Sequence, residues 1–186
     1  MKTAPLLTYE KPGKYESSRL EKIHNLIFDN SVAGSIAVAN EIATLIKEKQ
    51  QTNSICVLGL ATGSSPIKVY EELIRLHKEE NLSFKNVVTF NLDEYFPMQH
   101  DDIQSYHYFM NEYLFKHIDI LPENINIPNG ECTVEESLVL CTQYEEKIKK
   151  LGGIDFQLLG IGRTAHIGFN EPGSHQNSTT RMVTLD

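Results

Sequence analysis

Two segments of the sequence combine residues that can move protons. In the first, two adjacent carboxylates, Asp93 and Glu94, follow a short apolar run. In the second, which spans residues 160–173, a glycine-rich start leads to His166 and, five positions later, Glu171. A shielded carboxylate can act as a general base, and an imidazole that a carboxylate orients can relay protons near neutral pH. Each pattern also has an ordinary interpretation, because adjacent acids are usually solvated and a lone histidine is usually structural.

A third segment, residues 62–66, is suited to holding an anion. It reads Thr-Gly-Ser-Ser-Pro and follows another apolar run. Small and hydroxyl residues at the start of a helix leave backbone N–H groups free, and together with the helix dipole these groups can bind a phosphate. The alternative is a tight turn followed by a helix N-cap, since neither GxGxxG nor GxxxxGK[ST] is present.

The surrounding sequence alternates between helical periodicity and short, continuous apolar runs, which predict amphipathic helices and buried strands respectively. Thr133 and Glu136 form a capping-box pattern, and Ser31 is a possible N-cap. The expected elements are helices over 31–49, from Pro66 onward, over 105–115 and over 133–151, strands over 55–60, 87–90 and 154–160, and a connection over 121–130.

This alternation predicts a three-layer, Rossmann-like α/β fold, with a mainly parallel sheet flanked by helices. In such sheets, ligands bind beyond the carboxyl ends of the strands. Each of the three candidate segments directly follows a predicted strand. We therefore expect all three to meet at one edge of the sheet.

The composition limits the classes of function. The chain has 186 residues and a net charge of −8, which argues against nonspecific nucleic-acid binding. Three scattered cysteines argue against a disulfide framework or a zinc site and favour a reducing compartment. No run approaches the roughly 18 apolar residues of a membrane span, and the first residues lack a signal-peptide core. We expect a cytoplasmic protein with no membrane segment.

Six segments resemble, in the same order and at similar intervals, the successive signature segments of glucosamine-6-phosphate deaminases. They are LGLATGSSPIKVYEELI, VVTFNLDEY, QSYHYFM, PENINIPNG, QYEEKI and GIGRTAHIGFNEPGS. The resemblance covers residues 31–186, which we expect to form one deaminase-like domain, with residues 1–30 as an N-terminal arm. TGSSP alone also suits the wider superfamily that includes 6-phosphogluconolactonases and sugar-sensing regulator domains.

The resemblance implies a reaction and a set of residue roles. Members of that family open the ring of glucosamine 6-phosphate, move a proton from C2 to C1 through an enolamine, and release ammonia to leave fructose 6-phosphate, with no metal or organic cofactor. By resemblance, Asp93 is the base at C2 and C1, and His166, held by Glu171, moves the proton at the ring oxygen. The residues implied to bind the substrate phosphate are Gly63, Ser64 and Ser65, and those implied to shape the site are Thr62, Glu94 and Thr164.

The sequence departs from the family pattern in two places. Many members have an aspartate two residues before the histidine, whereas this chain has Thr164, so Glu171 is expected to orient His166 alone. Members also continue beyond the segment that corresponds to residues 180–185, and that remainder supplies further sheet, a lid and basic residues. We therefore expect a domain that is incomplete at its C-terminus, and a homo-oligomer in the full-length protein.

Two other functions use the same features. A 6-phosphogluconolactonase-like hydrolase would share the phosphate loop, but the Asn-Glu-Pro segment at residues 170–172 argues against it. A noncatalytic sugar-phosphate sensor would bind its ligand in the same pocket without turnover, but the presence of Asp93, His166 and Glu171 argues against that interpretation.

Overall fold

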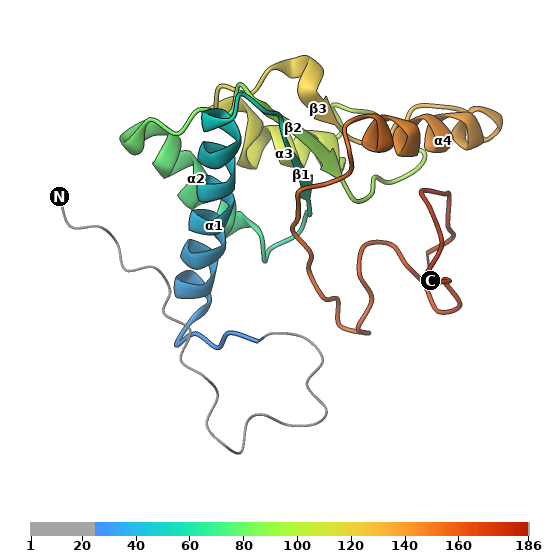
Figure 1. The fold of residues 1–186 in the computed structure, drawn as a ribbon. Helices are drawn as coiled ribbons and strands as arrows, with labels where there is room; N and C mark the ends of the chain where they lie inside the picture. The colour runs from blue at the N-terminus through green and yellow to red at the C-terminus, as the bar shows by residue number, and fades with distance from the viewer. Residues whose placement is uncertain (1–24, 186) are drawn as a thin grey trace.

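The computed structural model describes residues 25–185 and contains a four-stranded parallel sheet between two layers of helices (Figure 1). The strand order is β3-β2-β1-β4, and every pairing is parallel. The strands are β1 (Cys56–Leu60), β2 (Val87–Asn91), β3 (Ile125–Asn126) and β4 (Phe156–Gln157). The predicted three-layer α/β fold is confirmed. Most of the predicted N-terminal arm lies outside the described residues.

Helices cover both faces of the sheet. One layer consists of α1 (Ser31–Gln51), α2 (Ile67–Glu80) and α3 (Tyr106–Tyr113), and the other of α4 (Val134–Lys150) (Figure 1). Two short 3₁₀ helices, η1 (Phe115–His117) and η2 (Pro122–Asn124), lie between α3 and β3. No helix in the described part of the chain combines the length and the apolar character that a membrane span requires.

The two faces of the central strands bury different cores. Every residue of β1 and β2 is buried. Along β1, Cys56, Leu58 and Leu60 pack in the core shared with α1 and α2, whereas Val57 packs in the core beneath α4. Because both faces are covered, the sequences of these strands are continuous apolar runs, and this is why they could be predicted.

The helix ends follow local capping signals. Thr133 caps α4 through the predicted capping box, in which its hydroxyl accepts from the backbone N–H of Glu136 and the Glu136 carboxylate accepts from that of Thr133. α1 is capped by Asn30, whose side chain accepts from the backbone N–H of Ala33 at 2.9 Å. The predicted N-cap at Ser31 was therefore wrong by one position.

Two strands differ from the prediction. The strand predicted over 154–160 pairs with β1 only at Phe156 and Gln157, which are half-buried. The connection predicted over 121–130 contains β3, whose two residues pair with β2. Strands of two residues carry no hydrophobic period, so sequence patterns miss them or extend them too far.

The loop after β2 is fixed by a close backbone contact at Gly130. The N–H of Met98 donates to the Gly130 carbonyl at 2.8 Å. A Cβ at position 130 would lie 2.6 Å from the Tyr95 carbonyl oxygen and 2.8 Å from that of Met98. Only glycine lets the two backbones approach this closely, so Gly130 sets the position of this loop.

Gly130→Ala is expected to destabilise the fold by about 1–3 kcal/mol, the usual cost of overpacking, because the atoms that a Cβ would meet include two backbone oxygens. The free energy of unfolding from urea titrations measures this cost. Gly160→Ala is the matched control, since a Cβ there meets nothing within 4 Å. Equal effects of the two substitutions would contradict the close-contact interpretation.

Candidate active site

Three loops lie at the same edge of the sheet. The first loop follows β1 and contains residues 62–66, the second follows β2 and contains Asp93 and Glu94, and the third follows β4 and contains residues 160–173. β1 and β2 pair in register up to Leu60 and Asn91, and the N–H of Leu92 donates to the Leu60 carbonyl at 3.2 Å. β4 runs parallel to β1 on its other side. The three candidate segments of the sequence are the continuations of these strands, so the parallel pairing brings them together.

Asp93 lies just beyond the end of β2, partly buried against the third loop. A Cβ on Gly168 would be 3.1 Å from Asp93 Oδ2, and the backbone N–H of Phe169 interacts with the carboxylate. Burial raises the pKa of Asp93 to about 6, Glu94 adds to the rise, and the Phe169 N–H and His166 oppose it. A carboxyl group with this pKa is suited to act as a base near neutral pH.

The neighbouring Glu94 is engaged with backbone N–H groups. Its Oε1 accepts from Tyr95 at 2.8 Å and from Tyr106 at 2.9 Å, and its Oε2 accepts from His107 at 3.0 Å. Tyr106 and His107 are the first residues of α3, where the N–H groups have no partner within the helix and a carboxylate is favoured by the helix dipole. Glu94 therefore joins the second loop to the start of α3.

Three aromatic rings close over this edge, and sequence reasoning assigned a role to none of them. The ring centroid of Tyr95 lies 5.0 Å from that of Tyr106 and 4.9 Å from that of Phe169. The Tyr106 hydroxyl interacts with the hydroxyls of Tyr95 and Thr62, and burial raises its pKa. The signal that could have found Tyr106 is its place directly after Ser105, whose side chain caps α3.

His166 is held by its own loop. The Thr164 hydroxyl lies 2.7 Å from His166 Nδ1. The turn is closed by two backbone hydrogen bonds, from the Gly162 N–H to the His166 carbonyl at 2.8 Å and from the Ala165 N–H to the Gly162 carbonyl at 2.9 Å. Across the loops, His166 acts electrostatically on Asp93. The structure thus brings Asp93, Thr164 and His166 into one site.

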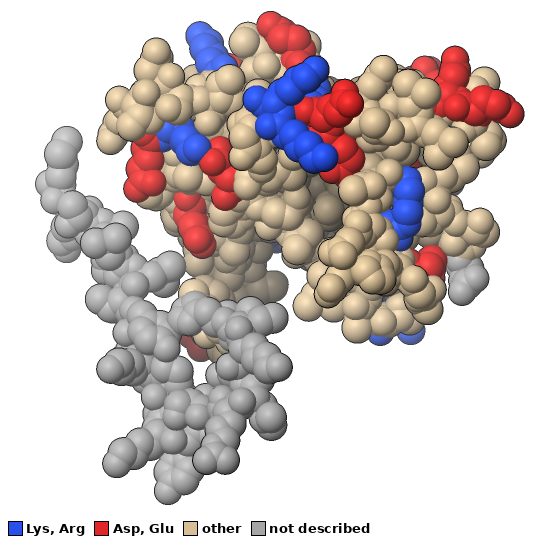
Figure 2. All heavy atoms as spheres, turned by 45° about the vertical axis from the view of Figure 1, so that its right-hand side comes forward, with Lys and Arg blue, Asp and Glu red and all other residues tan. Residues whose placement is uncertain are grey.

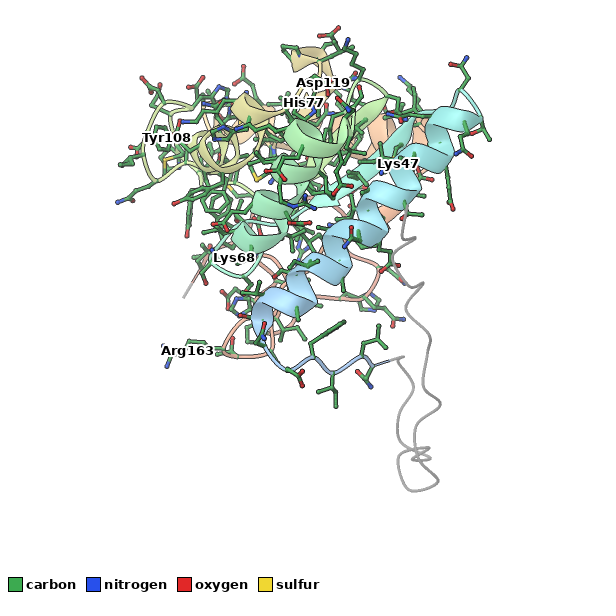
Figure 3. The ribbon with its side chains drawn as sticks, turned by 90° about the vertical axis from the view of Figure 1, so that its left-hand side faces the viewer. Lys47, Lys68, His77, Tyr108, Asp119 and Arg163 are labelled. Carbon is green, nitrogen blue, oxygen red and sulfur yellow. The ribbon has the colours of Figure 1, made fainter. Side chains whose placement is uncertain are left out.

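Glu171 is placed differently from this group. Its carbonyl accepts from the Ser174 N–H at 3.0 Å, and among residues 25–185 no hydrogen bond or ion pair joins its carboxylate to His166. Arg163, which precedes Thr164, extends outward from the third loop (Figure 3). In this structure the hydrogen-bond partner of the His166 ring is the Thr164 hydroxyl.

The first loop presents backbone N–H groups at the start of α2. Gly63 has a φ of +96°, which favours glycine, and Ser64 and Ser65 are exposed. α2 begins after Pro66 with no side-chain cap. Its first amides are therefore available to an anion, and the helix dipole favours negative charge there.

A cavity of about 580 Å³ opens beside Asp93, between the second loop, α4 and residues 178–185. Glu145 of α4 fixes part of its wall, because its Oε1 accepts from the N–H and the hydroxyl of Thr180, at 2.8 Å and 2.7 Å. Neither His166 nor the first loop lines this cavity. The cavity and the candidate phosphate loop are therefore separate features of the same edge.

Comparison with known proteins identifies the family. Residues 29–185 match the sequence model of glucosamine-6-phosphate isomerases/6-phosphogluconolactonases. The chain belongs to this family. Over 181 residues it is 47% identical to a glucosamine-6-phosphate deaminase-like protein of Bacteroides thetaiotaomicron, covering 96% of this chain and 27% of that relative. Over 151 residues it is 50% identical to a glucosamine-6-phosphate deaminase of Shewanella halifaxensis, covering 81% of this chain and 57% of that relative.

The chain therefore spans between about a quarter and just over half the length of these two relatives. Among solved structures, one described as a monomeric glucosamine-6-phosphate deaminase is 47% identical with a TM-score of 0.80, covering 86% of this chain and 64% of that chain. A 6-phosphogluconolactonase of Thermotoga maritima is 26% identical with a TM-score of 0.63, covering 78% and 63%. Of these two members of the family, the deaminase is the more similar.

The raised pKa of Asp93 predicts how stability depends on pH. The folded state holds this proton up to about pH 6, whereas the ordinary pKa of the group is 3.8. Folded protein thus binds more protons than unfolded chain in this window, and stability falls as pH rises from about 4 to 6. Asp93→Asn should therefore raise the free energy of unfolding at pH 7 by roughly 1–3 kcal/mol, and the gain should vanish toward pH 4.

Urea titrations at several pH values between about 4 and 7 measure this difference. Asp101→Asn is the control, because Asp101 is an exposed aspartate on the loop before α3. It should leave the pH dependence unchanged. A gain for Asp93→Asn that is the same at every pH would show that packing, and not ionisation, is responsible.

Proposed function

We propose that this protein is an aldose–ketose isomerising deaminase that converts glucosamine 6-phosphate and water to fructose 6-phosphate and ammonia. The observation that carries the proposal is Asp93, a carboxyl group with a pKa of about 6 at the end of a buried strand, coupled electrostatically to His166. A proton shuttle between two carbons and a separate relay at a ring oxygen require two titratable groups at one site. Relatives named as deaminases share about half of their aligned residues with this chain.

The proposed reaction gives each group one task. His166 moves the proton that the ring oxygen gains when the ring opens. The Asp93 carboxylate then takes the proton from C2, which with protonation of the C1 oxygen gives an enolamine, and it returns the proton to C1. The resulting iminium at C2 adds water and loses ammonia. Glu171 is the third proposed catalytic residue, by its place in the family motif, and its carboxylate makes no hydrogen bond or ion pair with His166 among residues 25–185.

The substrate phosphate is assigned to Gly63, Ser64 and Ser65, through the free amides at the start of α2. On the face drawn in Figure 2, acidic and basic side chains are interspersed, with no broad basic area of the kind that a nucleic acid needs. The partner we propose is therefore a small sugar phosphate. Residues 31–186 are proposed to carry this catalytic edge.

Asp93→Asn is expected to lower kcat for ammonia release from glucosamine 6-phosphate by roughly 100- to 10,000-fold, the usual contribution of a general base. The assay follows ammonia and fructose 6-phosphate produced by the full-length protein. In the unaltered protein, activity should fall as pH drops below about 6, because protonated Asp93 cannot accept the C2 proton. Asp101→Asn, the control, should retain full activity. A fully active Asp93→Asn variant would contradict the proposed mechanism.

A negative charge in the first loop should weaken substrate binding and leave the chemical step unchanged. Ser64→Asp is expected to raise KM for glucosamine 6-phosphate by at least about tenfold, since a carboxylate within a few ångströms repels the phosphate. Ser64→Ala, the control at the same position, should change KM much less, because the backbone amides remain. If Ser64→Asp leaves KM unchanged, the phosphate lies elsewhere.

The second candidate is hydrolysis of 6-phosphogluconolactone, which is favoured by the likeness to solved lactonases such as the one at 26% identity. Both substrates are therefore tested with the same preparation. Turnover of the lactone alone would assign the lactonase activity. Binding of glucosamine 6-phosphate without turnover would instead indicate a sensor domain.

The cytoplasm is the compartment we propose for this activity. Cys56, Cys132 and Cys141 are all free thiols, and Cys56 is buried in the core, as suits a reducing environment. Self-association of the full-length protein stays a prediction, and one solved relative is described as monomeric.

A further inference from the structure

We propose that Thr164 is a positioning residue whose hydroxyl holds the His166 imidazole in both of its neutral tautomers. The inference rests on the proposed function, because it concerns the histidine assigned to the ring oxygen. It starts from one contact: Thr164 Oγ1 lies 2.7 Å from His166 Nδ1, within hydrogen-bonding distance.

The backbone is shaped to make this contact. Thr164 and His166 are separated only by Ala165, whose φ of +61° is uncommon for a residue with a side chain and reverses the chain locally. Hydrogen bonds between Gly162 and residues 165–166 close the turn. Non-glycine residues in the left-handed region occur in turns and cluster at functional sites.

Gly162 packs against the imidazole ring of His166. A Cβ at this position would lie 2.3 Å from both Cε1 and Nε2 of His166, which is far inside van der Waals contact. The ring therefore lies directly over the Gly162 backbone and reaches the Thr164 hydroxyl with Nδ1. Two residues of the same turn thus fix both the position and the direction of the imidazole.

A hydroxyl and a carboxylate differ in the hydrogen bonds they can make to the His166 ring. A hydroxyl can donate to an unprotonated Nδ1 and can accept from a protonated one, whereas a carboxylate only accepts and so requires Nδ1–H. Thr164 can therefore hold the ring in each form. Its hydroxyl accepts from Nδ1–H in the imidazolium and in the neutral ring left when Nε2 gives its proton to the ring oxygen, and it donates to Nδ1 in the other neutral tautomer.

No other side chain takes over this task in the described structure. Asp93 acts on His166 through its charge and approaches from the second loop. Arg163 extends outward (Figure 3), and the Glu171 carboxylate makes no hydrogen bond or ion pair with the ring among residues 25–185. The orientation of His166 therefore depends on Thr164.

The test compares three substitutions in the full-length protein. Thr164→Val removes the hydroxyl at similar shape and should lower kcat on the order of 10- to 100-fold, the cost of a misplaced catalytic group, with KM changed less than about twofold. Thr164→Ser keeps the hydroxyl and should restore most of kcat. Gly162→Ala should resemble Thr164→Val because it displaces the ring, while Gly160→Ala, with no neighbour within 4 Å, should not.

Nitrogen-15 NMR of the histidine ring gives a readout that is independent of turnover. In the unaltered protein with a neutral ring, both His166 nitrogens should show shifts intermediate between protonated and unprotonated values, because both tautomers are held. Thr164→Asp should drive Nδ1 to the fully protonated value. His166→Gln identifies the signals.

Unchanged ring shifts in Thr164→Asp, or full kcat in Thr164→Val, would overturn the inference. If no substrate is turned over at all, the proposed function fails, and the ring shifts still decide whether Thr164 holds His166.

Discussion

The parallel pairing of β1 with β2 is the constraint on which the rest of the structure depends. Five residues of each strand pair in register and are buried on both faces, so neither strand can slide without exposing apolar side chains. The pairing continues into the loops, where the Leu92 N–H bonds the Leu60 carbonyl. At the end of β1, the buried Tyr70 hydroxyl of α2 donates to the Ala61 carbonyl. The first and second loops therefore leave the sheet from fixed, adjacent points.

The two adjacent carboxylates show how one edge gives similar groups different tasks. Glu94 is satisfied by three backbone N–H groups, two of them at the start of α3. Asp93, one residue earlier, interacts with one backbone N–H and is otherwise desolvated, and this raises its pKa to about 6. Leaving Asp93 poorly satisfied costs folding free energy, as expected for the base proposed at this site. Burial and partners, not residue type, distinguish the two acids.

Much of this arrangement could be predicted from the sequence, but for unequal reasons. β1, β2 and α4 were predictable because continuous apolar runs and a capping box are local signals. β3 and the short extent of β4 were not, because their pairing depends on neighbours far away in the sequence. Asp93 and His166 stood out by residue type and motif. The hydrogen bond between Thr164 and His166 could not be predicted, because it depends on the positive φ of Ala165, for which the sequence carries no signal.

α3 contacts all three loops at this edge of the sheet. Glu94 holds its first turn, and this places Tyr106 above the edge of the sheet. From there the Tyr106 hydroxyl interacts with Thr62 of the first loop and Tyr95 of the second, and its ring lies 5.7 Å from that of Phe169 in the third. The Phe169 N–H in turn interacts with Asp93. A displacement of α3 would thus move groups at the proposed phosphate loop and at the proposed base together.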